Sequence, residues 1–150
     1  MERKDWILVL LHATEGGHLD RVRIVKGLFL LSQESPEPLE NFYSFYPYLY
    51  GPFSSEIYSD LDELIEENLI AIDLKIAPSW SQYRLTDKGS SRAKELWKAL
   101  SKPIRQKLSE IAKNVLSLSF SKLLTYVYGK YPDYARESVL NPAGLEGVKA

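Results

Sequence analysis

Residues 69–89, LIAIDLKIAPSWSQYRLTDKG, decide the fold that the sequence predicts. Apolar side chains alternate through 69–76, which is typical of a strand with one buried face. Residues 78–81 form a loop, and 82–85 can pair back on the first strand. Thr86 and Asp87 then provide an N-cap for a helix. The stretch therefore predicts a β-hairpin that leads directly into a helix. The predicted buried face of its first strand carries Ile70, Ile72, Leu74 and Ile76.

Further helices are predicted on both sides of this hairpin. Apolar residues recur at helical spacing, and Asp20, Ser54 or Ser55, Ser101 and Ser119 stand where N-caps belong. Residues 42–50 are aromatic and extended, since Pro47 disfavours a helix, and Gly51-Pro52 is a turn. The predicted helices are 4–13, 20–33, 54–67 and 86–100, with a fifth from Pro103 and a sixth from 119 to about 129.

The order helix, helix, helix, hairpin, helix is typical of a winged helix-turn-helix. We therefore predict a mainly α fold with a small β-hairpin (α+β), in which the third helix has the place of a recognition helix and the helices after residue 100 are additions. The run 83–89, YRLTDKG, also resembles the junction between wing and helix in many winged-helix regulators. The length suits one domain, at 1–131 with its core at about 4–100, followed by a Pro- and Gly-containing tail at 132–150.

The composition is that of an ordinary globular protein, with 45% hydrophobic and 26% charged residues and a net charge of −1. The sequence has no cysteine, which excludes disulfides and thiolate metal sites and suits a reducing compartment. No apolar run approaches the roughly 20 residues that cross a bilayer. We expect a cytoplasmic protein with no membrane partner.

Two segments together resemble a known family. Residues 50–57, YGPFSSEI, and 23–31, RIVKGLFLL, resemble the Panacea (SocA-like antitoxin) group and related uncharacterised prokaryotic domains, which pair a lysine- and leucine-rich helix with a YGPxS turn and an acidic helix. The resemblance covers about residues 20–90 and departs from the group's pattern at Arg23 and Gly27. It implies a role in toxin–antitoxin or phage-linked regulation, as a binding module rather than an enzyme.

Charge is divided unevenly along the chain. Residues 35–75 carry nine acids and one lysine, a net charge of −8, whereas 76–131 carry eleven bases and three acids, a net charge of +8. The third predicted helix holds six of the acids and no base. Because phosphate contacts supply most of the non-specific affinity for DNA, this distribution disfavours insertion of the third helix into a major groove.

The first functional hypothesis is a regulatory module that binds DNA or a partner protein, as a homodimer. DNA would contact the wing and the basic helix after it. Trp80, at the wing tip, would either probe a groove or fold back on Tyr83 or Trp97. The start of the third helix would add phosphate contacts, since the helix dipole favours anions there. The candidate DNA contacts are Ser54, Ser55, Trp80, Arg84, Lys88, Arg92 and Lys94.

The second hypothesis is a protein-interaction module with no DNA binding. The acidic helix would meet a basic partner, and the tyrosines of 42–50 that the core does not need would form an apolar surface with hydroxyl groups. The candidate contacts are Tyr46, Tyr48, Asp60, Glu63 and Glu67. A solvated face without any partner is the alternative for each of the charged residues.

No pattern in the sequence points to catalysis, a cofactor or a metal. His12 and His18 are not spaced as zinc ligands, and the glycine motifs of nucleotide-binding loops are absent. Asp60, Glu63 and Glu67 share a helix face but have no histidine or second carboxylate cluster to complete a metal site. We therefore predict no catalytic residue, no metal ligand and no cofactor.

Overall fold

Helices dominate the part of the chain that a computed structural model describes, residues 1–75 and 80–136. The helices are α1 (Asp5–Ala13), α2 (Arg21–Glu34), α3 (Ser55–Glu66), α4 (Asp87–Ala99), α5 (Lys102–Ser117) and α6 (Phe120–Lys130), followed by a 3₁₀ helix at Pro132–Ala135. The strands are β1 (Leu19–Asp20), β2 (Tyr46–Tyr48), β3 (Gly51–Phe53), β4 (Ile70–Asp73) and β5 (Gln82–Leu85). The prediction of a mainly helical fold with a small antiparallel hairpin is confirmed.

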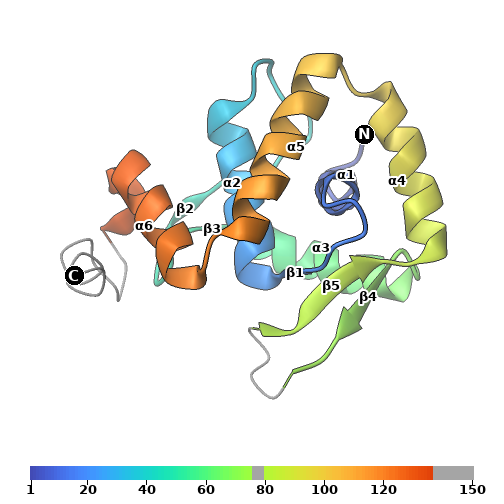
Figure 1. Ribbon diagram of the computed structural model, residues 1–150, viewed down its shortest axis with the longest axis horizontal. Helices are drawn as coiled ribbons and strands as arrows, with labels where there is room; N and C mark the ends of the chain where they lie inside the picture. The colour runs from blue at the N-terminus through green and yellow to red at the C-terminus, as the bar shows by residue number, and fades with distance from the viewer. Residues whose placement is uncertain (76–79, 137–150) are drawn as a thin grey trace.

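Helix α1 forms the centre of the core. Every side chain from Asp5 to Leu11 is buried. Figure 1 shows α1 nearly end-on, with α2 and α5 on one side and α4 on the other, and α1 contacts all three. A helix with apolar side chains all round is stable in water only when other elements cover it. The rest of the fold is therefore arranged around this helix.

The predicted hairpin belongs to a three-stranded antiparallel sheet with the order β1-β5-β4. Tyr83 of β5 lies opposite Leu19 on one side and Ile72 on the other. Strand β1 was not predicted, because a strand of two residues is too short to show an alternation of apolar and polar side chains. The first hairpin strand is also shorter than predicted. It ends at Asp73, Leu74 is exposed instead of lying on the buried face, and Ile76 lies outside the described residues.

A second, two-stranded sheet replaces the turn predicted at Gly51-Pro52. Both residues lie in β3, opposite Tyr48 and Pro47 of β2. Gly51 has φ of +91°, and a Cβ atom there would lie 2.5 Å from the ring of Tyr128 in α6. Glycine is therefore needed both for the backbone conformation and for the close approach of this hairpin to α6.

Four helices begin at side-chain caps that the sequence predicts, whereas the Ser54 side chain at the start of α3 forms no cap hydrogen bond. Asp20, Thr86, Ser101 and Ser119 each accept a hydrogen bond from a backbone N–H in the first turn of their helix. These bonds satisfy donors that would otherwise lack a partner at a helix start.

The C-terminal helices wrap the body of the protein. Helix α5 packs across α1 and α2, and Arg23 donates hydrogen bonds to the carbonyls of Val115 (2.9 Å) and Leu118 (2.8 Å) at the end of α5. At Gly27 a Cβ atom would lie 3.1 Å from a methyl carbon of Leu10, so glycine lets α2 approach α1 closely. Arg23 and Gly27 thus both have a packing role in this chain.

The beginning of the predicted tail packs on the body. The ring of Tyr134 lies 4.6 Å from that of Phe29, and Ala135 is buried. The remainder of the tail, 137–150, lies outside the described residues. Within the described ranges, no helix is long and apolar enough to cross a membrane.

Gly89 provides a test of the junction between hairpin and helix. A Cβ atom at this position would lie 1.8 Å from the backbone oxygen of Leu69. We expect Gly89→Ala to lower the free energy of unfolding by about 3 kcal/mol, since backbone atoms must move to make room. Urea unfolding followed by circular dichroism measures this loss. Gly129→Ala is the matched control, because nothing lies within 4 Å of its Cβ position. A stability equal to that of the control would contradict this packing.

Candidate functional site

The predicted DNA-contacting bases lie on β5 and α4, and three of them have acceptors within their own chain. Arg84 lies 3.4 Å from Asp73, and Arg92 lies 3.5 Å from Asp5. The Nζ atom of Lys88 donates to the backbone oxygen of Glu67, just after the end of α3, at 3.0 Å. The charges of Arg84 and Arg92 are therefore partly balanced by carboxylates of the same chain, whereas Lys88 meets only a neutral carbonyl.

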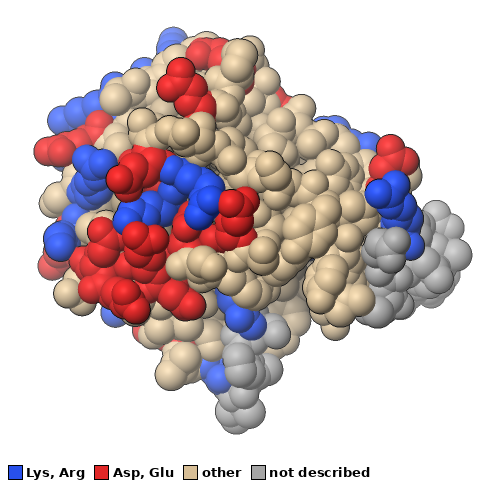
Figure 2. Space-filling model, turned by 180° about the vertical axis from the view of Figure 1, so that it is seen from behind, with Lys and Arg blue, Asp and Glu red and all other residues tan. Residues whose placement is uncertain are grey.

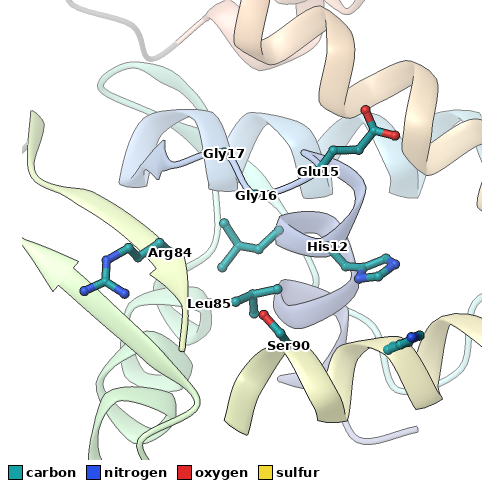
Figure 3. A pocket seen from close by; sticks show the side chains of 9 residues that line it. His12, Glu15, Gly16, Gly17, Arg84, Leu85 and Ser90 are labelled. Atoms are coloured by element: carbon teal, nitrogen blue, oxygen red, sulfur yellow. The ribbon is translucent and has the colours of Figure 1, made fainter. Parts of the chain in front are cut away.

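A shallow hollow of about 490 Å³ lies between these bases and the end of α1. Lys94 and Arg84 line it together with His12 and the glycines of the loop after α1. Figure 3 shows that Arg84 extends away from His12 and Glu15, so the labelled polar side chains do not converge. Burial, followed by the nearby charge of Lys94, lowers the pKa of His12 below its usual value. This hollow does not gather groups on one point as an anion site would.

The start of α3 does not provide the predicted pair of phosphate contacts. Ser54 is the N-cap residue, but it is only 1% exposed, and its Oγ atom has no hydrogen-bond partner in the described structure. Ser54 therefore cannot reach DNA, which corrects that assignment. Ser55 is exposed, but Glu56 follows it in the first turn.

The acidic side of α3 is tied to the N-terminus of the chain. Asp60 is buried, so it is not the surface contact that the sequence suggested. It accepts hydrogen bonds from Arg3 (2.9 and 2.8 Å) and from the Tyr43 hydroxyl (2.6 Å). Burial alone would raise the pKa of Asp60, but these two donors outweigh it and hold the pKa below its usual value. Asp60 is thus a structural carboxylate.

Glu63 and Glu67 share one lysine. The Nζ atom of Lys4 lies 2.9 Å from Glu63 and 2.6 Å from Glu67. Figure 2 shows the resulting cluster of acids with lysine and arginine side chains set into it. On α3, Asp62 and Glu66 are exposed and have no ion pair among the residues that the structure describes. They are the acids of this helix that remain available to a partner.

The predicted tyrosine surface is present beside this acidic cluster. Tyr46 and Tyr48 on β2 are 43% and 47% exposed, and Leu49 and Tyr50 in the turn after them are similarly exposed. Tyr48 stacks on Phe53 with ring centroids 5.2 Å apart, which fixes its orientation. Figure 2 shows a wide area without charged side chains next to the acidic cluster. We call Tyr46, Tyr48, Leu49 and Tyr50 the tyrosine surface.

A hollow of about 310 Å³ opens on this surface, and it contains a residue that the sequence analysis did not select. Lys26 of α2 lines the hollow but is only 3% exposed, and its Nζ atom donates to the Pro52 carbonyl at 3.0 Å. Burial lowers the pKa of this lysine to about 7. The other residues that line the hollow are Val22, Val25, Tyr48, Leu49, Tyr50, Gly51, Phe53 and Tyr58.

A second hollow of about 240 Å³ adjoins the first, since Val22, Tyr50 and Tyr58 line both. Arg21 lies over the ring of Tyr58, 4.6 Å from its centroid. Trp80 is 39% exposed and packs edge-on against Phe120 of α6, with ring centroids 5.0 Å apart. Trp80 therefore packs on neither Tyr83 nor Trp97, the two contacts expected from sequence. We call the two hollows together the aromatic cleft.

One signal in the sequence pointed to Lys26. It lies one helical turn after Val22 and one before Leu30, on a stripe that is otherwise apolar. The ammonium group of a lysine on such a stripe must either reach water at the edge of the helix packing or be buried among apolar side chains. Its partner Pro52 belongs to the YGP run, 26 residues further along the chain, so the contact itself could not be read from spacing.

The ion cluster at Asp60 predicts a distinct acid-dependent loss of stability. Because the pKa of Asp60 is lower in the folded chain than its ordinary 3.8, its contribution is complete above that pH and is lost as the pH falls through the folded value. We expect Asp60→Asn to lower the free energy of unfolding by about 2 kcal/mol at pH 6 and by much less at pH 2.5. Urea unfolding at both pH values tests this, with Asp62→Asn as the exposed control. An equal loss at both pH values would show that the charge of Asp60 is not involved.

Lys26 predicts the opposite kind of pH dependence. Its pKa is about 7 when folded and 10.5 ordinarily, so the buried charge destabilises the fold fully below pH 7, and the penalty disappears as the pH rises towards 10.5. We expect Lys26→Met to raise the free energy of unfolding by about 2 kcal/mol at pH 6, and the gain to shrink by pH 10. The exposed Lys113→Met is the control. A gain that does not change with pH would contradict a buried charge at Lys26.

Comparison with known proteins adds no assignment to this geometry. No protein-family model matches the chain, and no curated protein matches it.

Proposed function

We propose that this chain is a winged-helix regulatory module that binds a partner protein through the tyrosine surface and the free acids of α3. The element order and the three-stranded sheet, in which β1 joins the hairpin, support the winged-helix assignment. The observation that carries the binding role is the exposure of four large side chains, Tyr46, Tyr48, Leu49 and Tyr50, on one hairpin. Monomeric proteins seldom leave several large side chains exposed together unless they contact something.

Tyrosines suit this role for physical reasons. A tyrosine side chain offers a large contact area with only two side-chain torsions to restrict, so little conformational entropy is lost on binding. Stacking against Phe53 already restricts Tyr48 before a partner arrives. Tyrosine is accordingly common among the residues that dominate protein interfaces.

The charge beside the tyrosine surface selects the partner's chemistry. Asp62 and Glu66 are exposed on α3 without ion pairs among the described residues, whereas Glu63 and Glu67 are bound to Lys4. Complementary charge accelerates association and excludes partners of like charge. The partner should therefore present lysine or arginine residues around an apolar centre. An antitoxin-like role, as the resemblance to the Panacea group implies, would fit such a partner.

DNA is the second candidate partner, and the net charge of +8 in residues 76–131 favours it. Lys94, Lys98 and Lys102 are exposed on α4 and at the start of α5, and no ion pair of theirs occurs in the described part of the chain. This second mode would use α4 and not the acidic α3. A homodimer would need a surface other than the inward side of α5, because Ile104, Leu108, Ile111 and Val115 are buried.

Two double variants, one at acidic residues and one at basic residues, distinguish a protein partner from DNA. Tagged chain is purified from the cells that naturally make it, alongside Asp62→Lys with Glu66→Lys and, as the matched control, Lys98→Glu with Lys102→Glu. We expect one protein to copurify with the parent and the control but at least tenfold less with the Asp62/Glu66 variant, since that variant places like charges against a basic partner. Tyr46→Ser with Tyr48→Ser should cause a similar loss.

The same proteins are titrated against mixed-sequence duplex DNA by fluorescence anisotropy from about 50 to 200 mM salt, the range in which phosphate-driven binding weakens steeply. We expect no salt-dependent binding. Binding by the parent that the Lys98/Lys102 variant loses, together with unchanged protein recovery in the Asp62/Glu66 variant, would replace the protein partner with DNA.

A further inference from the structure

Lys26 is the only lysine or arginine that is buried in the described residues. Two partly buried cations of the described chain do lie against carboxylates: Lys4 against Glu63 and Glu67, and Arg23 against Asp20. Among the described residues, Lys26 donates only to the neutral carbonyl of Pro52, although an ammonium group has three protons to donate. Burying a cation without a counter-ion costs free energy. Lys26 lacks the carboxylate partner that Lys4 and Arg23 have.

Arg21 repeats the pattern on the other side of the aromatic cleft. Its guanidinium lies over the Tyr58 ring, and its Nε atom is buried without a hydrogen-bond acceptor in the described structure. Among the residues that the structure describes, those that line the two hollows include both of these cations and no aspartate or glutamate. The cleft therefore combines unpaired positive charge with an apolar, mostly aromatic wall.

We propose that the aromatic cleft binds a small amphipathic anion, a ligand with one carboxylate and an apolar body. The carboxylate would pair with Lys26, Arg21 in the adjoining hollow would add a second positive charge, and the apolar body would lie among the rings of Tyr48, Tyr50 and Tyr58. This inference goes beyond partner binding and does not depend on it, because it concerns the isolated chain.

The size and lining of the cleft fit such a ligand. Hollows of about 310 and 240 Å³ that share Val22, Tyr50 and Tyr58 give room for a body of about ten carbon atoms. Small-molecule sites are usually apolar pockets with a few polar groups that fix orientation. Here Lys26 lines the larger hollow and Arg21 the smaller one, and the hairpin of β2 and β3 forms the opposite wall of the larger hollow.

The carboxylate supplies what the site lacks. A charged ligand gives Lys26 the counter-ion that burial makes valuable, and charge-assisted hydrogen bonds are shorter and stronger than those to a neutral carbonyl. A neutral ligand of equal shape would gain only the contacts with the rings. The difference in affinity between an acid and its amide therefore measures the contribution of the two cations.

The experiment is isothermal titration calorimetry of the purified full chain at pH 6.5 with two acids, 4-phenylbutyrate and octanoate, and with their primary amides. We expect at least one acid to bind at least tenfold more tightly than its amide. Comparing the affinities of 4-phenylbutyrate and octanoate shows whether the tyrosine rings prefer an aryl or an alkyl body. In Lys26→Met the acid should bind no better than the amide, and Arg21→Gln should lose at least threefold for the acid alone. Lys113→Met is the control and should keep the full preference.

Thermal unfolding followed by circular dichroism shows whether each variant is folded. If Lys26→Met does not fold, Arg21→Gln still tests the site. Equal binding of acid and amide by the parent chain, or no detectable binding of either acid at 1 mM ligand (order of magnitude for a weak site), would overturn the proposal. So would an undiminished preference for the acid in both variants. Because no partner protein is present, failure here leaves the copurification result unaffected.

Discussion

The burial of α1 is the constraint on which the rest of this structure depends. Its side chains from Trp6 to Leu11 are apolar and almost fully buried, so the helix has no face that water can solvate. Helices α2, α4 and α5 therefore surround it. The loop after α1 leads into the short strand β1, which pairs with β5 and completes the sheet. The additional C-terminal helix α5 is thus part of the core and not an appendage, because without it α1 would be exposed on one side.

The same helix explains why the acidic residues of α3 are so poor a guide to function. The charged residues that precede α1, Arg3 and Lys4, lie against α3 and bind Asp60, Glu63 and Glu67. Three acids selected from sequence as partner contacts are therefore engaged in holding the N-terminus to α3. Asp62 and Glu66 are exposed and make no ion pair among the described residues, so a partner can contact them.

Local signals in the sequence predicted local structure well. Thr86, Ser101 and Ser119 cap helices because a hydroxyl oxygen at the N-cap position lies within reach of the free backbone N–H groups of the first turn. The sequence could not show that Lys26 meets Pro52, or that Trp80 packs on Phe120, because these contacts join residues 26 and 40 positions apart. Nor could it separate the tyrosines. Tyr43 is buried against Asp60 while Tyr46 is exposed, although both stand in one aromatic run.

The aromatic cleft is where the structure departs most from what stability alone would select. Lys26 lies on an apolar stripe that Leu or Met would fill without the cost of a buried ammonium, and exposed tyrosines on β2 add nothing to the core. Residues that lower stability are retained where they act on something outside the fold. Lys26, Arg21, Tyr48 and Tyr50 all line the two adjoining hollows of the cleft. A ligand bound in the cleft would cover Tyr48 and Tyr50 and so compete with a partner for the same rings, which joins the two proposed binding events through one surface.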